Sequence, residues 1–220
     1  MHTSRHFRPQ LPITLAALLL IPLLSCSSAY YGVLEKAGIH KRDILVDRVE
    51  EARDSQAEAQ EQFQSALEQF NAVVTLQETD LSIAYDRMKA AFDDSQHSAD
   101  EVSQRINRVE SVAEDLFEEW EEELKLYQSA ELRRSSERTL RDTRGQYARM
   151  ISKMRQAEEK MAPVLALFRD NVLYLKHNLN AQAIGSLRDE FSSLQGKIQR
   201  LIADMNRSIE ASNDFIANLQ

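Results

Sequence analysis

The chain has 220 residues, a formal net charge of -8, and 43% hydrophobic and 28% charged residues. These proportions are typical of a folded protein and exclude a disordered one. The acidic net charge argues against nucleic acid, or anionic lipid, as the main partner, because a polyanion requires a basic face. A protein with an acidic net charge can still carry local patches of basic residues.

Residues 1–25 have the pattern of a cleaved secretory signal peptide. Arg5 and Arg8 supply a positive start, and residues 11–24 form an apolar run. This run is shorter than the roughly twenty apolar residues that span a bilayer. It ends in a tetrapeptide that resembles the lipobox of bacterial lipoproteins, Leu23-Leu24-Ser25-Cys26.

The lipobox resemblance implies that the signal peptide is cut before Cys26 and that Cys26 carries acyl chains. Each buried methylene of an acyl chain contributes about 0.8 kcal/mol, so two or three chains anchor a protein stably in a membrane. Cys26 is the only cysteine, so the mature chain has no internal disulfide. By the same resemblance, Ser27 in place of an aspartate implies sorting to the outer membrane, facing the periplasm.

Residues 26–42 are expected to be the lipidated N-terminus and a short connector. Tyr30 and Tyr31 lie close to the lipid in sequence. They are compatible with two positions, at the membrane interface, where amphipathic rings are favoured, or packed against the base of the folded body. Asp43 is the expected N-cap of the first long helix.

Residues 43–220 are predicted to form an all-α, elongated antiparallel coiled-coil-like bundle. Turn residues are scarce, since Pro163 is the only proline after Pro22 and the whole chain has five glycines. Apolar or small residues recur three and four apart, the period of helices that pack along a seam. Small and large residues alternate along these seams, which favours antiparallel helices. The predicted helices cover about 43–75, 80–128, 133–178 and 181–219.

The connection between the second and third helices contains no glycine or proline, so two arrangements are considered. Either residues 129–136 form a turn, or one helix continues from 81 to 178. Acidic residues 118–123 precede the segment, and arginines from Arg133 to Arg144 follow it. A hairpin would place these opposite charges side by side and offset their unfavourable position on the helix dipoles. The hairpin is therefore favoured. Pro163 predicts a kink in the third helix.

The sequence contains no convincing catalytic, metal or cofactor site. Beyond the signal peptide the histidines are His40, His97 and His177, and none lies within a helical turn of another. The acidic run 118–123 lacks the bent loop of a calcium site, so a solvated face is the preferred interpretation. There is no GxSxG motif and no glycine-rich phosphate loop. We expect the protein not to be an enzyme, and no residues are assigned to catalysis, metal or nucleic acid.

Residues 34–49, followed by Glu51-Ala52-Arg53 and by Gln62-Phe63 to Phe70, carry a family resemblance. They are similar to the opening of an uncharacterised family of bacterial coiled-coil lipoproteins, a domain of unknown function. The resemblance extends over most of the mature chain. It again implies a lipoprotein and a helical body, but it brings no activity, so no functional residue can be carried over.

The function expected from the sequence is that of a lipid-anchored structural or interaction protein of the cell envelope, acting as scaffold, spacer or accessory subunit. Its expected partners are the membrane, through Cys26, and a protein or further copies of itself, through helical faces. The alternative is a helical module that binds lipid or another apolar ligand, for which Met150, Met154 and Met161 would offer an adaptable surface. A first helix shorter than its neighbours would leave part of a seam exposed for a partner.

Overall fold

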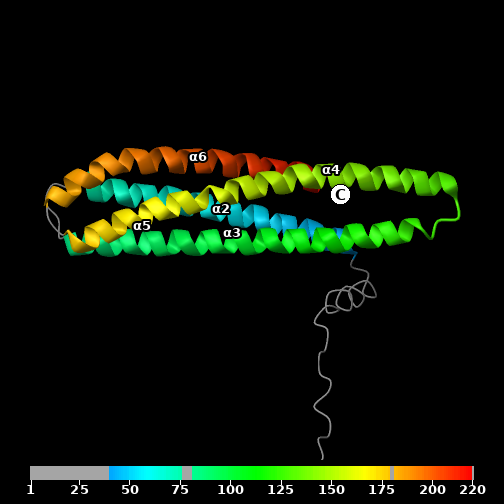
Figure 1. Cartoon of the computed structure of the whole chain (residues 1–220), viewed down its shortest axis with the longest axis horizontal. Coiled ribbons are helices and arrows are strands. Elements are labelled where there is room, and N and C mark those ends of the chain that lie inside the picture. Colours follow the sequence, from blue (N-terminus) through cyan, green and yellow to red (C-terminus); the bar gives the residue numbers. More distant parts are fainter. Residues whose placement is uncertain (1–39, 76–80, 179–180, 220) are drawn as a thin grey trace, which may run out of the picture.

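The computed structural model describes residues 40–75, 81–178 and 181–219. In these ranges the chain forms α-helices and no strand: α2 (Lys41–Thr75), α3 (Leu81–Leu124), α4 (Ala130–Glu159), α5 (Met161–His177) and α6 (Ala181–Leu219). α4 and α5 follow one another along one line, so the molecule has four long rods that run alternately in opposite directions (Figure 1). The predicted all-α antiparallel bundle is confirmed.

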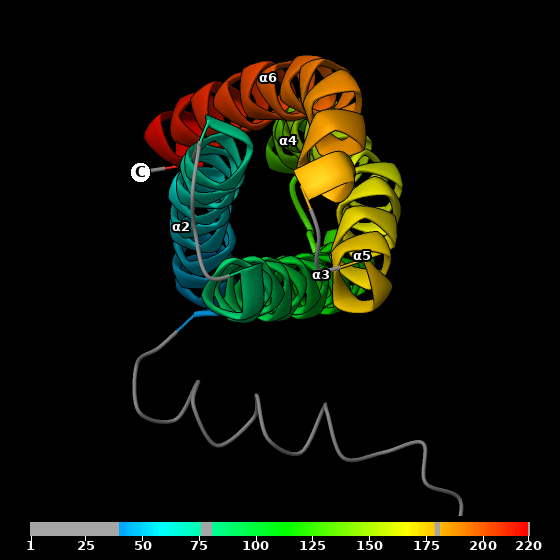
Figure 2. The same cartoon turned by 90° about the vertical axis from the view of Figure 1, so that its left-hand side faces the viewer.

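The four rods form a closed ring around one continuous core (Figure 2). α2 packs against α3 and α6, and α4 with α5 closes the ring between α3 and α6. The buried side chains follow the three-and-four spacing of the sequence, as in Leu45, Val49, Ala52, Gln56 and Ala59 of α2. An α-helix repeats every 3.6 residues, so this spacing keeps one stripe facing its neighbours.

α2 begins before the N-cap expected at Asp43. Lys41 and Arg42 are helical, and His40 is the last residue before the helix. The backbone N–H of His40 donates to Oδ2 of Asp43 at 3.4 Å. Asp43 therefore acts as the acidic third residue of a capping box, where a carboxylate reaches back to the helix start. The connector is shorter than expected by these two residues.

The hairpin between α3 and α4 is present, but its turn lies earlier than the expected segment 129–136. α3 ends at Leu124, and α4 begins at Ala130. The N–H groups of Lys125 and Leu126 donate to the carbonyls of Glu122 and Glu123, three residues back, at 3.1 and 2.9 Å. This tighter winding closes the end of α3. All of the expected turn except its first residue is helical.

Ser129 starts α4. Its side chain accepts a hydrogen bond from the backbone N–H of Leu132 at 3.3 Å and satisfies one of the free donors of the first turn. The expected helix start at residue 133 is therefore three residues late.

The kink predicted at Pro163 is a break of the helix at Lys160. Pro163 has no N–H to donate to the carbonyl of Glu159, and its ring would clash with that carbonyl. The proline itself lies in the first turn of α5, where a missing N–H costs nothing. α5 then continues in nearly the same direction to His177 (Figure 1). The expected helix 133–178 is thus two helices, whereas α6 has the predicted bounds 181–219.

The core contains both aromatic rings and small polar groups. At the end where α2 stops and α3 starts, four rings form a cluster from four helices: Phe70, Phe92, Phe168 and Phe191. The same core also contains the small or polar residues Gln56, Ser95, Ser208 and Ser212. The Ser208 hydroxyl donates to Oε1 of Gln56 at 2.7 Å. Small polar groups thus lie close to large rings in one core, since Ser95 is one turn from Phe92 and Ser212 is one turn from Phe215.

Candidate interaction surfaces

The histidines do not converge on a site. His40 precedes α2, His97 lies within α3 and His177 ends α5. Within residues 40–75, 81–178 and 181–219, no group of three histidine, cysteine, aspartate or glutamate side chains could hold a metal ion. Cys26, Tyr30 and Tyr31 lie outside the described residues.

The acidic run 118–123 connects α3 to its neighbours. Glu119 pairs with Lys41 of α2 at 3.3 Å, Glu122 pairs with Lys125 at 2.5 Å, and Glu121 pairs with Arg144 of α4. The hydrogen bond from Arg144 and the charge of Arg144 lower the pKa of Glu121. The Arg144 guanidinium also lies 5.1 Å from the centre of the Phe117 ring. The acids at the end of α3 and the bases at the start of α4 lie side by side, as the hairpin requires.

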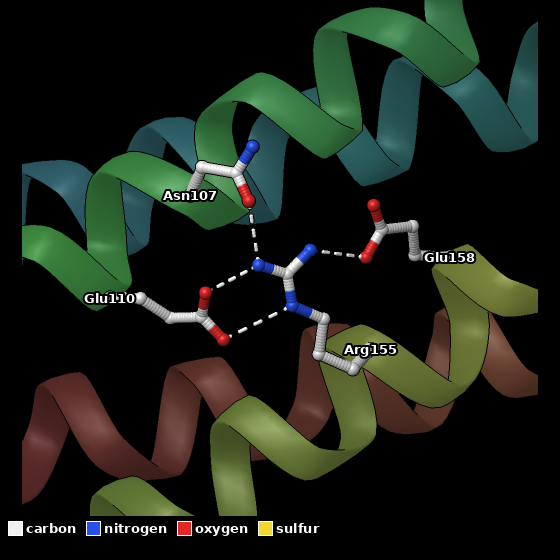
Figure 3. A network of polar contacts seen from close by, with 4 residues as sticks. All are labelled: Asn107, Glu110, Arg155 and Glu158. Carbon is white, nitrogen blue, oxygen red and sulfur yellow. Dashed lines mark hydrogen bonds and ion pairs between the residues drawn. The ribbon is translucent and has the colours of Figure 1, made fainter.

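A second polar network joins α3 and α4 further along the bundle (Figure 3). Arg155 of α4 donates through Nε to Glu110 at 3.1 Å, through a terminal nitrogen to Asn107 at 2.6 Å, and through the other to Glu158 at 2.6 Å. The hydrogen bond to Glu110 is the main cause that raises the pKa of Arg155. The four side chains satisfy one another, so the arrangement is a cross-brace between helices.

The methionine stripe of α4 and α5 lies inside the bundle. Met150, Met154 and Met161 are all buried in the core. Their flexible side chains fill space between the rods, which is a common role of methionine in cores. The stripe is therefore mainly core, although Met161 also lines the groove where α4 gives way to α5.

A shallow groove of about 660 Å³ lies where α4 gives way to α5 and both face α3. Ala99 and Ser103 of α3 face Ala162 and Ala166 of α5 across it. Charged side chains of both signs line its edges, namely Asp100, Arg155, Glu158, Glu159 and Arg169. The groove therefore follows from small residues at the helix break and has no single electrostatic preference.

The large exposed apolar side chains of the described residues all lie toward the ends of the rods. Ile83, Leu173 and Tyr174 belong to one end, at the start of α3 and the end of α5. Leu126, Tyr127 and Leu132 belong to the other, at the turn between α3 and α4, and are 74%, 41% and 58% exposed. The flanks of the rods are polar, so apolar contacts with other molecules are available chiefly at the ends.

The α3–α4 turn projects beyond the rest of the bundle (Figure 1). The start of α2 is level with Glu119, as the ion pair with Lys41 shows. From there α3 continues to Leu124, about 8 Å of helix at 1.5 Å per residue. Of the described helices, only α3 and α4 reach this region, and Trp120 Nε1 holds them together by donating to the Ser136 hydroxyl at 2.8 Å. We call residues 125–134 the tip.

The comparison with protein families decides which family this chain represents. The family described as "Protein of unknown function (DUF2959)" matches residues 30–219. The chain belongs to this family. The resemblance seen in residues 34–70 is thus confirmed as a domain of unknown function, and the DUF2959 match covers the whole bundle. No curated protein and no solved structure gives a significant match. In the described part of this DUF2959 protein, no helix is long and apolar enough to cross a membrane.

The tip is the feature that sequence reasoning did not single out. Besides the change from acidic to basic residues, the sequence signals the turn by a failure of the apolar seam of α3 after Trp120, where Glu123 and Tyr127 take the seam positions. A failed seam predicts a turn, but it does not reveal which side chains remain exposed. That information came from the relative lengths of α2 and α3.

Proposed function

We propose that this DUF2959 protein is a non-catalytic, lipid-anchored structural or interaction protein of the bacterial cell envelope. It is held at the outer membrane, facing the periplasm, by acyl chains on Cys26. Its role is that of a scaffold, spacer or accessory subunit. The observation that carries the proposal is a lipobox cysteine followed by a long closed bundle whose exposed large apolar side chains lie toward its two ends.

The closed core supports an interaction role over a carrier role. Among the described residues, forty apolar side chains are buried in one cluster that runs through all four rods. Opening the rods to admit a lipid would expose this surface at a cost of roughly 25 cal/mol for each Å². The ends of the bundle offer apolar contacts without such a cost. A rigid rod with contacts at its ends is suited to holding two structures at a fixed separation.

The anchor is tested by substituting Cys26→Ala in cells fed with labelled fatty acid. We expect the variant to incorporate no label and to accumulate as unprocessed or mislocalised precursor, because the thiol that receives the lipid is gone. Ser27→Ala is the matched control, since it alters the neighbouring residue and leaves Cys26 in place. Incorporation of label by Cys26→Ala would show that the assignment of Cys26 is wrong.

The interaction role is tested by reversible crosslinking in intact cells, followed by purification in detergent and identification of what is attached. A second protein in fixed proportion would make this protein an accessory subunit, and crosslinked copies of the chain alone would make it a self-assembling spacer. Repeated recovery of uncrosslinked monomer, with Cys26 lipidated, would count against both forms of the proposal.

A further inference from the structure

We propose that the tip, residues 125–134, rests on the surface of the membrane in which the N-terminus is anchored, with Leu126, Tyr127 and Leu132 at the boundary between headgroups and acyl chains. This inference rests on the lipid anchor of the proposed function and adds a second, non-covalent contact. That contact would fix how the bundle stands relative to the bilayer, instead of leaving it on a free tether.

The geometry places the tip and the anchor at the same end of the bundle. The start of α2 lies beside Glu119, a little behind the tip. Residues 27–40 connect Cys26 to α2, and a chain of that length spans at most about 50 Å when fully extended. The tip is the part of the described bundle that projects furthest at this end (Figure 1). A surface that holds Cys26 is therefore within reach of the tip.

The apolar side chains of the tip have the character of membrane-interface residues. Leu126 and Tyr127 lie in the turn, and Leu132 lies one turn into α4. All three are exposed, whereas the leucines of the same helices further along, such as Leu116 and Leu140, are buried in the core. A tyrosine ring with its hydroxyl is favoured at the depth of the headgroups, where it can contact acyl chain and water together.

Local charge is compatible with a phospholipid surface, although the chain as a whole is acidic. Residues 125–134 contain three bases, Lys125, Arg133 and Arg134, and one acid, Glu131. Two of these bases already have acidic partners on the bundle, since Lys125 pairs with Glu122 at 2.5 Å and Arg133 pairs with Glu137 at 3.6 Å. The local charge of the tip therefore does not repel an anionic phospholipid surface strongly, and the apolar side chains are the main source of the proposed contact.

The small size of the apolar surface favours a bilayer over a protein as its occupant. Three partly exposed side chains present much less than the about 800 Å² per partner of a stable protein interface. A bilayer requires no complementary shape, and the anchor already holds it nearby, so a weak contact is sufficient. A second copy of the chain, joined tip to tip, is the competing occupant that an experiment must exclude.

The test depends on the fact that the chain has a single cysteine, Cys26. Once lipidated, Cys26 has no free thiol, so Leu126→Cys gives one reactive site for an environment-sensitive fluorophore. The labelled lipoprotein is reconstituted in vesicles of phosphatidylethanolamine and phosphatidylglycerol, with and without lipids that carry a nitroxide near the headgroup. Ile83→Cys is the matched control, because residue 83 is 48% exposed at the opposite end of the bundle.

We expect the probe at residue 126 to be quenched several-fold more strongly than the probe at residue 83, and to emit at shorter wavelength. Equal quenching in vesicles that carry the protein would overturn the tip contact while leaving the anchor intact. Failure of the protein to float with vesicles would overturn the anchor and the inference together. Quenching that depends on protein density and not on nitroxide lipid would show tip-to-tip contact instead.

Discussion

The two ends of the bundle are built in opposite ways. One end is formed by all four rods (Figure 2), and rings from α2, α3, α5 and α6 meet there in the cluster Phe70, Phe92, Phe168 and Phe191. At the other end, α3 and α4 continue alone and leave three large apolar side chains exposed. The first end also exposes Ile83, Leu173 and Tyr174, but there four rods surround the aromatic cluster, whereas the exposed side chains of the second end lie on two helices only.

Apolar side chains in one protein can therefore have separate roles according to the number of helices around them. Four antiparallel rods can surround a ring completely, and its transfer from water then stabilises the fold. Two rods share only one seam and leave most of their circumference in water. Substitutions at the aromatic end should therefore change the free energy of unfolding, and substitutions at the tip should not.

The largest effect is expected from Phe168→Ala. Phe168 is fully buried and contacts Phe70 and Phe92, at ring centre distances of 6.3 and 6.0 Å. Loss of the ring leaves a cavity that the rods cannot fill, so the free energy of unfolding should fall by about 3–5 kcal/mol. Urea unfolding followed by circular dichroism measures this change.

Phe168→Leu is the matched control for that experiment. It keeps an apolar side chain of similar size, and the expected loss is below about 1.5 kcal/mol. A loss for Phe168→Ala no greater than that for Phe168→Leu would show that the aromatic end does not dominate the stability of the bundle.

Periodicity accounts for most of what could be predicted about these two ends. The spacing of residues such as Phe63, Phe70 and Phe168 gave the helices and their buried faces, because a seam must match the helical repeat over its whole length. The exposed residues of the tip could not be predicted in the same way. Their exposure depends on where α2 begins and α6 ends relative to α3, which is a property of helix lengths in three dimensions.

Turns without glycine or proline were the second limit of sequence reasoning. The α3–α4 turn is set by Ser129, whose hydroxyl caps α4, but Ser135 and Ser136 nearby offered the same signal. The distribution of charge correctly predicted a hairpin and not a continuous helix, because Glu121 of α3 and Arg144 of α4 form an ion pair between the two arms of the hairpin. It did not fix the turn to within a few residues, since a long side chain can reach its partner from several positions.

An intermediate effect is expected in the middle of the bundle from Asp204→Asn. Asp204 is nearly buried on α6 and pairs with Lys160, at the α4–α5 break, and with Arg207. Burial raises its pKa, but hydrogen bonds and charges from Lys160 and Arg207 outweigh burial, and the net pKa is lowered. Both bases are half exposed, so we expect a loss of about 1–3 kcal/mol at neutral pH.

The pH dependence of that loss identifies its cause. A carboxyl with a lowered folded pKa contributes stability above its ordinary value of 3.8, and this contribution disappears as pH falls through the folded pKa. The difference between wild type and Asp204→Asn should therefore be full at neutral pH and shrink below about pH 4. Asp214→Asn, an exposed aspartate on the same helix, is the control. An unchanged difference at low pH would mean that packing, and not charge, accounts for the loss.

The smallest effect is expected at the tip, from Leu126→Ser combined with Leu132→Ser. Both leucines are already largely in water, so each substitution should change the free energy of unfolding by no more than about 0.5 kcal/mol. Leu194→Ser is the matched control, because Leu194 is fully buried on α6. It places a hydroxyl and a cavity in the core and should cost more than about 3 kcal/mol.

The pair of tip substitutions also connects stability to membrane contact. If the leucines of the tip are exposed in solution, the double variant unfolds in urea like wild type. In the lipidated double variant, the tip should then no longer lie close to the bilayer. A substantial loss of stability would instead mean that Leu126 and Leu132 are covered in solution, most simply by another copy of the chain. That loss would grow with protein concentration, since association stabilises the folded state by mass action. Unfolding midpoints at two protein concentrations therefore distinguish a tip that faces a membrane from one that faces its own copy.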